Sequence, residues 1–135
     1  MMFVDACAII ALLSDEPEAE RVSEAIAGAQ EPMTSPVAAL EAALGLARPD
    51  KFNLSIKAVE TLILEFLDER GIEIRDLPPA AETLSLALSA AHRYRSGRGR
   101  LTLGDCLHCA CAKYYRVPIL ATADEFRQTD LETIS

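Results

Sequence analysis

The sequence has 135 residues, half of them hydrophobic, and a formal net charge of −8 at pH 7. A chain of this length can fold as a single domain, 1–135, with a core of its own, and its apolar content excludes intrinsic disorder. The acidic balance argues against non-specific wrapping of nucleic acid and favours a cationic partner or a metal ion.

The N-terminal stretch 2–13 is apolar except for one residue, Asp5. It is shorter than the roughly 20 apolar residues of a membrane span. It also lacks the flanking features of a signal peptide, so we expect a cytoplasmic protein with no membrane partner. The pattern predicts a buried strand over 2–4 and a helix over 7–13. An ionised carboxylate among buried side chains is costly unless a cation or hydrogen-bond donors receive it, so Asp5 needs a partner.

Apolar periodicity, capping residues and glycines predict the remaining elements. Ser14 or Asp15 is expected to cap a second helix that ends near Gly28, and Ser35 is expected to cap a third. The later helices are expected over 36–46, 55–70, 80–94 and 102–115, and the later strands over 31–34, 72–77, 117–121 and 131–134. Strands that alternate with helices indicate an α/β fold with a central, mainly parallel sheet covered by helices on both faces.

Three further carboxylates have unusual surroundings. Glu41 is the one charge of an otherwise apolar helix, and Asp105 follows Thr102 with nearly the spacing of a capping box. Asp124 follows the strand expected over 117–121 as Asp5 follows the strand expected over 2–4, and ligands of open α/β sheets bind beyond such strand ends. Each acid also has an ordinary interpretation, namely an exposed helix face for Glu41, a helix cap for Asp105 and a turn for Asp124.

Carboxylates that are brought together repel one another unless a hard cation joins them, and oxygen ligands suit Mg²⁺ or Mn²⁺. Such centres activate water and stabilise the leaving oxygen in phosphodiester hydrolysis. The sequence therefore supports the hypothesis of a metal-dependent hydrolase. Its proposed ligands are Asp5, Glu41, Asp105 and Asp124.

The order and context of these acids resemble the PIN domain, and specifically the VapC-type toxins of bacterial toxin–antitoxin pairs. Four segments in the right order carry the resemblance, which spans nearly the whole chain. They are Val-Asp-Ala at 4–6, Pro-Val-Ala-Ala-Leu-Glu at 36–41, Leu-Gly-Asp-Cys-Leu-His-Cys-Ala at 103–110, and Thr-Ala-Asp-Glu-Phe at 122–126 with Thr-Asp-Leu at 129–131.

The resemblance implies a three-layer α/β/α fold, Mg²⁺- or Mn²⁺-dependent endoribonuclease activity on RNA, homodimerisation, and inhibition by a VapB-type antitoxin. It makes Asp5, Glu41, Asp105 and Asp124 the metal-binding, catalytic acids. The sequence departs from the family at two positions. Cys7 stands where the family commonly has serine or threonine, and Glu125 stands where aspartate is frequent before the phenylalanine, so Asp124 and Glu125 compete for the fourth role.

Two alternatives remain at this stage. A thiol or zinc protein would use Cys106 and Cys109, but on a helix these two share one face while His108 and Cys111 lie on another, so the four cannot meet at one ion. We interpret the cysteines as core residues and His108 as a packed or surface histidine. A non-catalytic PIN-like binding module would keep the fold and lose the acids, and the presence of all four favours the enzyme.

An arginine-rich segment precedes the helix that carries Asp105. Arg98 and Arg100 are candidate contacts to RNA phosphates, and a solvated basic loop explains the same residues equally well. The sequence does not indicate which RNA would be cleaved.

Overall fold

The computed structural model describes residues 1–94 and 101–134, and its centre is a five-stranded sheet in the order β3-β2-β1-β4-β5. All pairings are parallel, as predicted. The strands are β1 (Met2–Val4), β2 (Pro32–Thr34), β3 (Glu73–Ile74), β4 (Ile119–Leu120) and β5 (Thr133–Ile134). The chain adds β2 and β3 on one side of β1 and then β4 and β5 on the other. The order therefore reverses beside β1, and such a switch point is where α/β sheets bind ligands.

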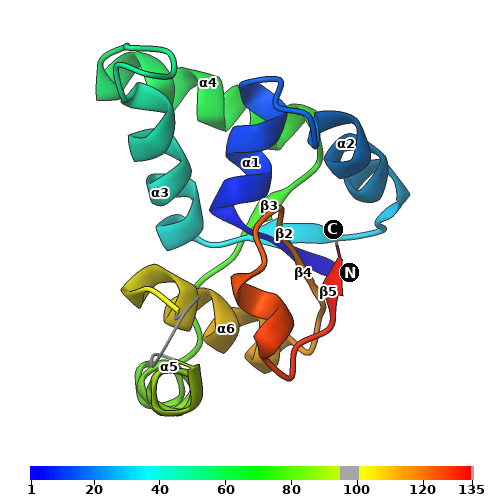
Figure 1. The fold of residues 1–135 in the computed structure, drawn as a ribbon, viewed down its shortest axis with the longest axis vertical. Helices are drawn as coiled ribbons and strands as arrows, with labels where there is room; N and C mark the ends of the chain where they lie inside the picture. Colours follow the sequence, from blue (N-terminus) through cyan, green and yellow to red (C-terminus); the bar gives the residue numbers. More distant parts are fainter. Residues whose placement is uncertain (95–100, 135) are drawn as a thin grey trace.

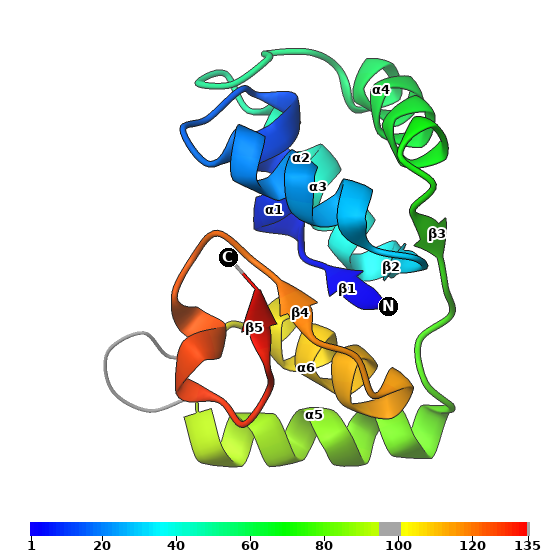
Figure 2. The same cartoon turned by 90° about the vertical axis from the view of Figure 1, so that its right-hand side faces the viewer.

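Helices cover both faces of this sheet. They are α1 (Ala6–Leu13), α2 (Ala19–Gly28), α3 (Pro36–Ala47), α4 (Ile56–Glu69), α5 (Ala80–Tyr94) and α6 (Leu103–Tyr115), with a short 3-10 helix, η1 (Glu125–Gln128). Figures 1 and 2 show α1 to α4 on one side of the sheet and α5 and α6 on the other. The predicted three-layer α/β/α arrangement is confirmed. Among the described residues, no helix is both long and apolar enough to cross a bilayer.

The central strand β1 supplies side chains to both cores. Successive side chains of a strand point to opposite faces. Met2 and Val4 accordingly pack with α1 to α4, while Phe3 packs with α5 and α6. All three are almost completely buried, so β1 and the residue that follows it are firmly placed.

The prediction that Ser14 or Asp15 caps the second helix is wrong. The amide of Ser14 still donates to the carbonyl of Ile10, so Ser14 ends α1, and Asp15 has a left-handed φ of 53°. Neither residue has the extended backbone of an N-cap. The helix α2 begins instead at Ala19, after Glu18, whose side chain makes no capping bond.

The strands predicted over 72–77 and 117–121 are shorter in the structure, two residues each. Their partners β2 and β1 have only three residues, and a ladder cannot extend beyond the strand with which it pairs. The flanking apolar residues remain buried without belonging to a strand, as Val117 and Ala121 do.

Candidate metal centre

Asp5 lies directly after β1 and is the N-cap of α1. Its amide donates to the carbonyl of Leu120 at 3.0 Å, which joins it to the neighbouring strand β4. Its Oδ2 accepts the Cys7 thiol at 2.8 Å and the Cys7 amide at 3.4 Å. Only 4% of Asp5 is exposed, and its Oδ1 has no hydrogen-bond partner among the residues that the structure describes. Burial raises the pKa of Asp5, and the nearby His108 and Cys7 offset this only in part.

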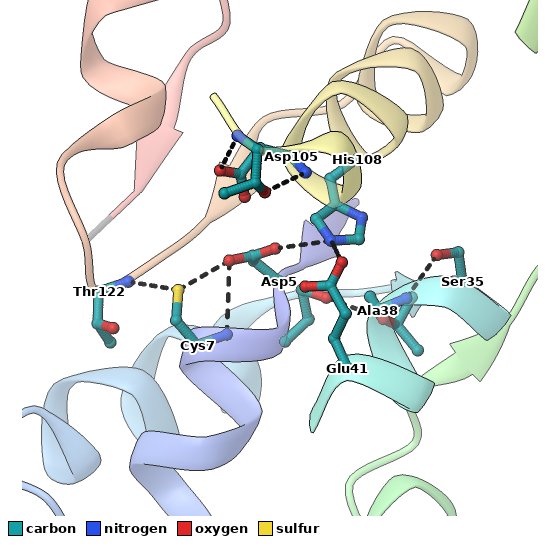
Figure 3. Close-up of polar contacts among 11 residues, drawn as sticks. Asp5, Cys7, Ser35, Ala38, Glu41, Asp105, His108 and Thr122 are labelled. Atoms are coloured by element: carbon teal, nitrogen blue, oxygen red, sulfur yellow. Dashed lines mark hydrogen bonds and ion pairs between the residues drawn. The ribbon is translucent and has the colours of Figure 1, made fainter. Parts of the chain in front are cut away.

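The thiol of Cys7 occupies the position where the family commonly has a hydroxyl. It donates to Asp5 and also accepts the amide of Thr122 at 3.3 Å, so it connects α1 to the segment that follows β4 (Figure 3). A thiol is a weaker donor than a hydroxyl, but it makes the same kind of contact here.

Asp105 sits in the first turn of α6 in a complete capping box. Thr102 Oγ1 accepts the Asp105 amide at 3.1 Å, and Asp105 Oδ2 accepts the Thr102 amide at 3.0 Å. The predicted cap is therefore confirmed. A carboxylate has two oxygens, each able to accept more than one contact, so the cap does not exclude a metal ligand.

Glu41 reaches the same site from α3. The cap of α3 is the predicted one, with Ser35 accepting the amide of Ala38 at 3.1 Å and proline at the first position. Glu41 Oε1 lies 3.2 Å from His108 Nε2. Its carboxylate also occupies the space above Gly104, where an added Cβ would stand 1.6 Å from Oε1. The Gly-Asp pair of α6 thus leaves room for Glu41 and supplies Asp105.

His108 is the site residue that the sequence interpretation undervalued. It is completely buried, as the packed interpretation required, but its Nε2 faces both Glu41 at 3.2 Å and Asp5 Oδ1 at 3.5 Å (Figure 3). Within the described ranges 1–94 and 101–134, neither ring nitrogen has a well-aligned hydrogen bond. Burial lowers the pKa of His108, but the contact with Glu41 and the charges of Asp5, Glu41 and Asp105 outweigh it and raise the pKa above its usual value. The sequence did contain one indication of this role, because His108 is three residues after Asp105 and residues with this spacing share one face of a helix.

These side chains fit a divalent cation. Asp5, Asp105 and His108 each offer one ligand atom, and the three atoms lie within 4.8 Å of one another. The unpartnered Oδ1 of Asp5 is a buried acceptor that a cation would satisfy. Glu41 extends the group through its contact with His108. The structure therefore brings together three of the four predicted acids.

Asp124 is not among the residues whose ligand atoms form this group. It precedes η1, its side chain is 89% exposed, and its Oδ1 contacts Arg127 Nε at 3.1 Å. Glu125, its competitor, is half-buried in the first position of η1. A metal role for either acid stays a prediction. Arg98 and Arg100 lie outside the described residues.

The cysteines of α6 belong to the core. Cys106, Cys109 and Cys111 are buried, are not in disulfides, and pack with the α5–α6 side of the sheet. Burial raises the pKa of Cys109 to about 12 and that of Cys111 to about 11, so these thiols stay protonated at neutral pH. Within the described part of the chain, no group able to hold a metal includes a cysteine. The thiol or zinc alternative therefore has no support.

Comparison with known proteins agrees with this geometry. The PIN domain family matches residues 2–130. The chain is 33% identical to ribonuclease VapC36 of Mycobacterium tuberculosis over 134 residues, which cover 97% of this chain and 91% of that protein. In fold it is similar to M. tuberculosis VapC20, a toxin that cleaves the sarcin–ricin loop, with a TM-score of 0.76, 14% identity and coverage of 97% and 96%. It is also similar to VapBC2 of Rickettsia felis bound to a promoter DNA fragment, with a TM-score of 0.69, 14% identity and coverage of 98% and 97%. The chain belongs to the PIN domain family and, within it, to the VapC ribonucleases.

Proposed function

We propose that this protein is the toxin of a VapB/VapC-type pair and cleaves RNA phosphodiester bonds with Mg²⁺ or Mn²⁺ held by Asp5, Glu41 and Asp105. PIN nucleases use divalent metal, and the relatives are ribonucleases. One observation carries the proposal most directly. Asp5 is a buried carboxylate at the switch point of the sheet with one oxygen unpartnered.

Each residue near the site has a definable task. When bound, the metal would activate water and neutralise charge on the phosphate. Cys7 holds Asp5 Oδ2, and Thr102 holds Asp105 Oδ2, so each carboxylate is oriented by a donor on its own helix or cap. Gly104 gives Glu41 access to the site. Asp124 is proposed as the fourth acid, which would act from the exposed rim.

RNA is a polyanion and the chain carries a net charge of −8, so substrate binding requires local positive charge. We assign this role to Arg98 and Arg100. A cytoplasmic location, where RNA substrates are found, is part of the same proposal.

Protein partners are proposed on a separate observation. Large apolar side chains are exposed on the α3–α4 surface and on the α5–α6 surface, and such patches mark interaction sites. They are Leu40, Leu44, Ile56 and Leu64 on the first surface and Leu84, Leu88 and Leu103 on the second. A VapB-type antitoxin and a second copy of this chain are the proposed partners. Light scattering on the chain alone and with its antitoxin would measure both assemblies.

The decisive experiment is incubation of the protein with total RNA in EDTA and in Mg²⁺ or Mn²⁺, followed by mapping of the cut sites. Cleavage should require metal and be lost in Asp105→Asn. An asparagine oxygen can still accept the Thr102 amide, so the cap and the melting temperature should survive. Asp50→Asn, at an exposed ion pair with Arg48, is the control and should cleave normally.

Two results would contradict the proposal. Cleavage that persists in EDTA and in Asp105→Asn would exclude this metal centre. RNA binding without cleavage under any metal condition would favour the non-catalytic binding module instead.

A further inference from the structure

His108 brings a nitrogen atom into a site whose other proposed ligands are carboxylate oxygens. The imidazole is 0% exposed, and neither nitrogen has a well-aligned hydrogen-bond partner in the part of the chain that the structure describes. Leaving a buried polar atom unpaired costs free energy. The ring packs against Phe3, with centroids 5.7 Å apart, and this contact gives its nitrogens no partner. The atoms that face Nε2 are carboxylate oxygens of Glu41 and Asp5, so a cation shared among these three atoms would satisfy the nitrogen and both oxygens.

The distances around Nε2 suit a shared metal ion. Adjacent ligands of a six-coordinate ion with bonds of about 2.1 Å stand about 3.0 Å apart, and those of a tetrahedral ion stand about 3.4 Å apart. Nε2 lies 3.2 Å from Glu41 Oε1 and 3.5 Å from Asp5 Oδ1. An ion bound between these atoms would have one nitrogen and two carboxylate oxygens among its ligands.

We propose that His108 ligates the metal through Nε2 and makes this site prefer Mn²⁺ and similar transition-metal ions over Mg²⁺. Imidazole suits transition metals, whereas Mg²⁺ prefers oxygen ligands and retains water. This inference rests on the proposed function only in that Asp5 and its neighbouring carboxylates bind a divalent ion. It adds a nitrogen ligand, His108, and a preference for Mn²⁺ over Mg²⁺.

A different role for His108 makes a different prediction. The ring could carry a proton on Nε2 and donate it to Glu41 and Asp5, which would position the carboxylates without a nitrogen–metal bond. Replacement of His108 would then weaken Mg²⁺ and Mn²⁺ to the same extent, because both ions would use the same oxygens.

The first test is pulsed electron paramagnetic resonance of the Mn²⁺-loaded wild-type protein. A directly bound imidazole should give a nitrogen hyperfine coupling that changes when the histidines carry ¹⁵N. The chain has two histidines, and the other, His92, is exposed on α5. His92→Gln should keep the signal, and His108→Gln should lose it.

The second test is calorimetric titration of the same three proteins with Mg²⁺ and with Mn²⁺. Glutamine can place an oxygen near the position of Nε2, so His108→Gln exchanges the donor atom and keeps a polar group. We expect its Mn²⁺ affinity to fall by about tenfold or more, with a much smaller change for Mg²⁺. His92→Gln should titrate as the wild type does.

The outcomes separate this inference from the proposed function. Bound Mn²⁺ without nitrogen coupling, or equal losses for both ions in His108→Gln, would overturn the ligand role and leave the metal nuclease in place. Failure of the wild-type protein to bind either ion would overturn the metal centre as a whole. If His108→Gln does not fold, the resonance experiment on the wild-type protein still decides.

Discussion

Asp5 and Asp124 follow the ends of two hydrogen-bonded neighbouring strands, yet they end in opposite environments. Asp5 comes directly after β1, caps α1 and is 4% exposed. Asp124 comes four residues after β4, makes no side-chain cap to η1, and has a side chain that is 89% exposed and paired with Arg127. A strand end is therefore not enough to bury a carboxylate. The next helix must also begin there and hold the side chain between the layers.

The two segments remain connected through Cys7, whose thiol accepts the amide of Thr122 and donates to Asp5. Asp5, on the buried side, has a carboxylate oxygen without a partner among the described residues. Asp124, on the exposed side, forms a solvated ion pair with Arg127. Neutralising the two acids should therefore have very different consequences for activity and stability.

The largest effect is expected for Asp5→Asn on RNA cleavage in Mn²⁺ or Mg²⁺. Loss of a metal-binding charge at the centre of the site should lower the rate by about 10²- to 10³-fold. Asp124→Asn, at the exposed rim, should lower it by about tenfold or less. Rates on one mapped RNA substrate check both values, and losses of equal size would show that the difference in burial has no bearing on catalysis.

The next effect concerns the space above Gly104. Gly104→Ala places a Cβ where the Glu41 carboxylate lies, and a displacement of this kind can cost about a hundredfold in rate. Gly28→Ala is the matched control, since its Cβ would meet nothing within 4 Å.

Glu41→Gln should reproduce the loss seen in Gly104→Ala and remove most of the thermal stabilisation that metal provides to the wild-type protein. If Gly104→Ala cleaves RNA as the wild type does, the present position of Glu41 is not required for the reaction.

A smaller effect is expected on the stability of the metal-free protein. Because burial raises the pKa of Asp5, its ionisation opposes folding above the ordinary aspartate pKa, so Asp5→Asn should be more stable at pH 7. An increase in melting temperature of about 4 °C, corresponding to about 1 kcal/mol, is the expected size. The gain should shrink as the pH falls toward about 4, where the unfolded-state carboxyl becomes protonated.

Asp50→Asn is the control for this stability difference, because the pKa of Asp50 is shifted in the opposite direction from that of Asp5. Its hydrogen bond to Arg48 lowers the pKa of Asp50, so removing that charge should not raise the melting temperature at pH 7. Thermal melts in EDTA between pH 4.5 and 7 measure both variants, and a lower melting temperature for Asp5→Asn at pH 7 would contradict the assigned cost of burying Asp5.

The smallest effect is expected on RNA binding, from neutralising Arg98 and Arg100 in the arginine-rich segment before α6. In an Asp105→Asn background, Arg98→Ala with Arg100→Ala should weaken RNA binding several-fold. The slope of log affinity against log salt should flatten by about 1.4, for two contacts to single-stranded phosphates. Arg48→Ala with Arg70→Ala removes the same charge near the ends of α3 and α4. An identical slope change in both double variants would reflect net charge alone.

Local signals in the sequence were sufficient where the chemistry is local. Serine before Pro36 and threonine before the Leu-Gly-Asp segment placed the caps of α3 and α6, and both are confirmed because a capping bond joins residues only three apart. Apolar runs predicted β1 and β4, and period-two alternation predicted β3, although β3 and β4 are shorter than expected. The acids at positions 5, 41 and 105 were found because each is a charge in an apolar or capping context.

Tertiary structure decided what those acids face. From the sequence, His108 was one residue of a cysteine-rich helix, and only the packing of α6 against β1 and α3 turns its Nε2 toward Asp5 and Glu41. The same packing gives Gly104 its role, because the side chain that fills its space comes from a helix more than fifty residues earlier. The sequence determined which side chains could bind a cation. The meeting of helices distant in the chain decided which atoms share the site, because burial and contact distance depend on packing that no local pattern encodes.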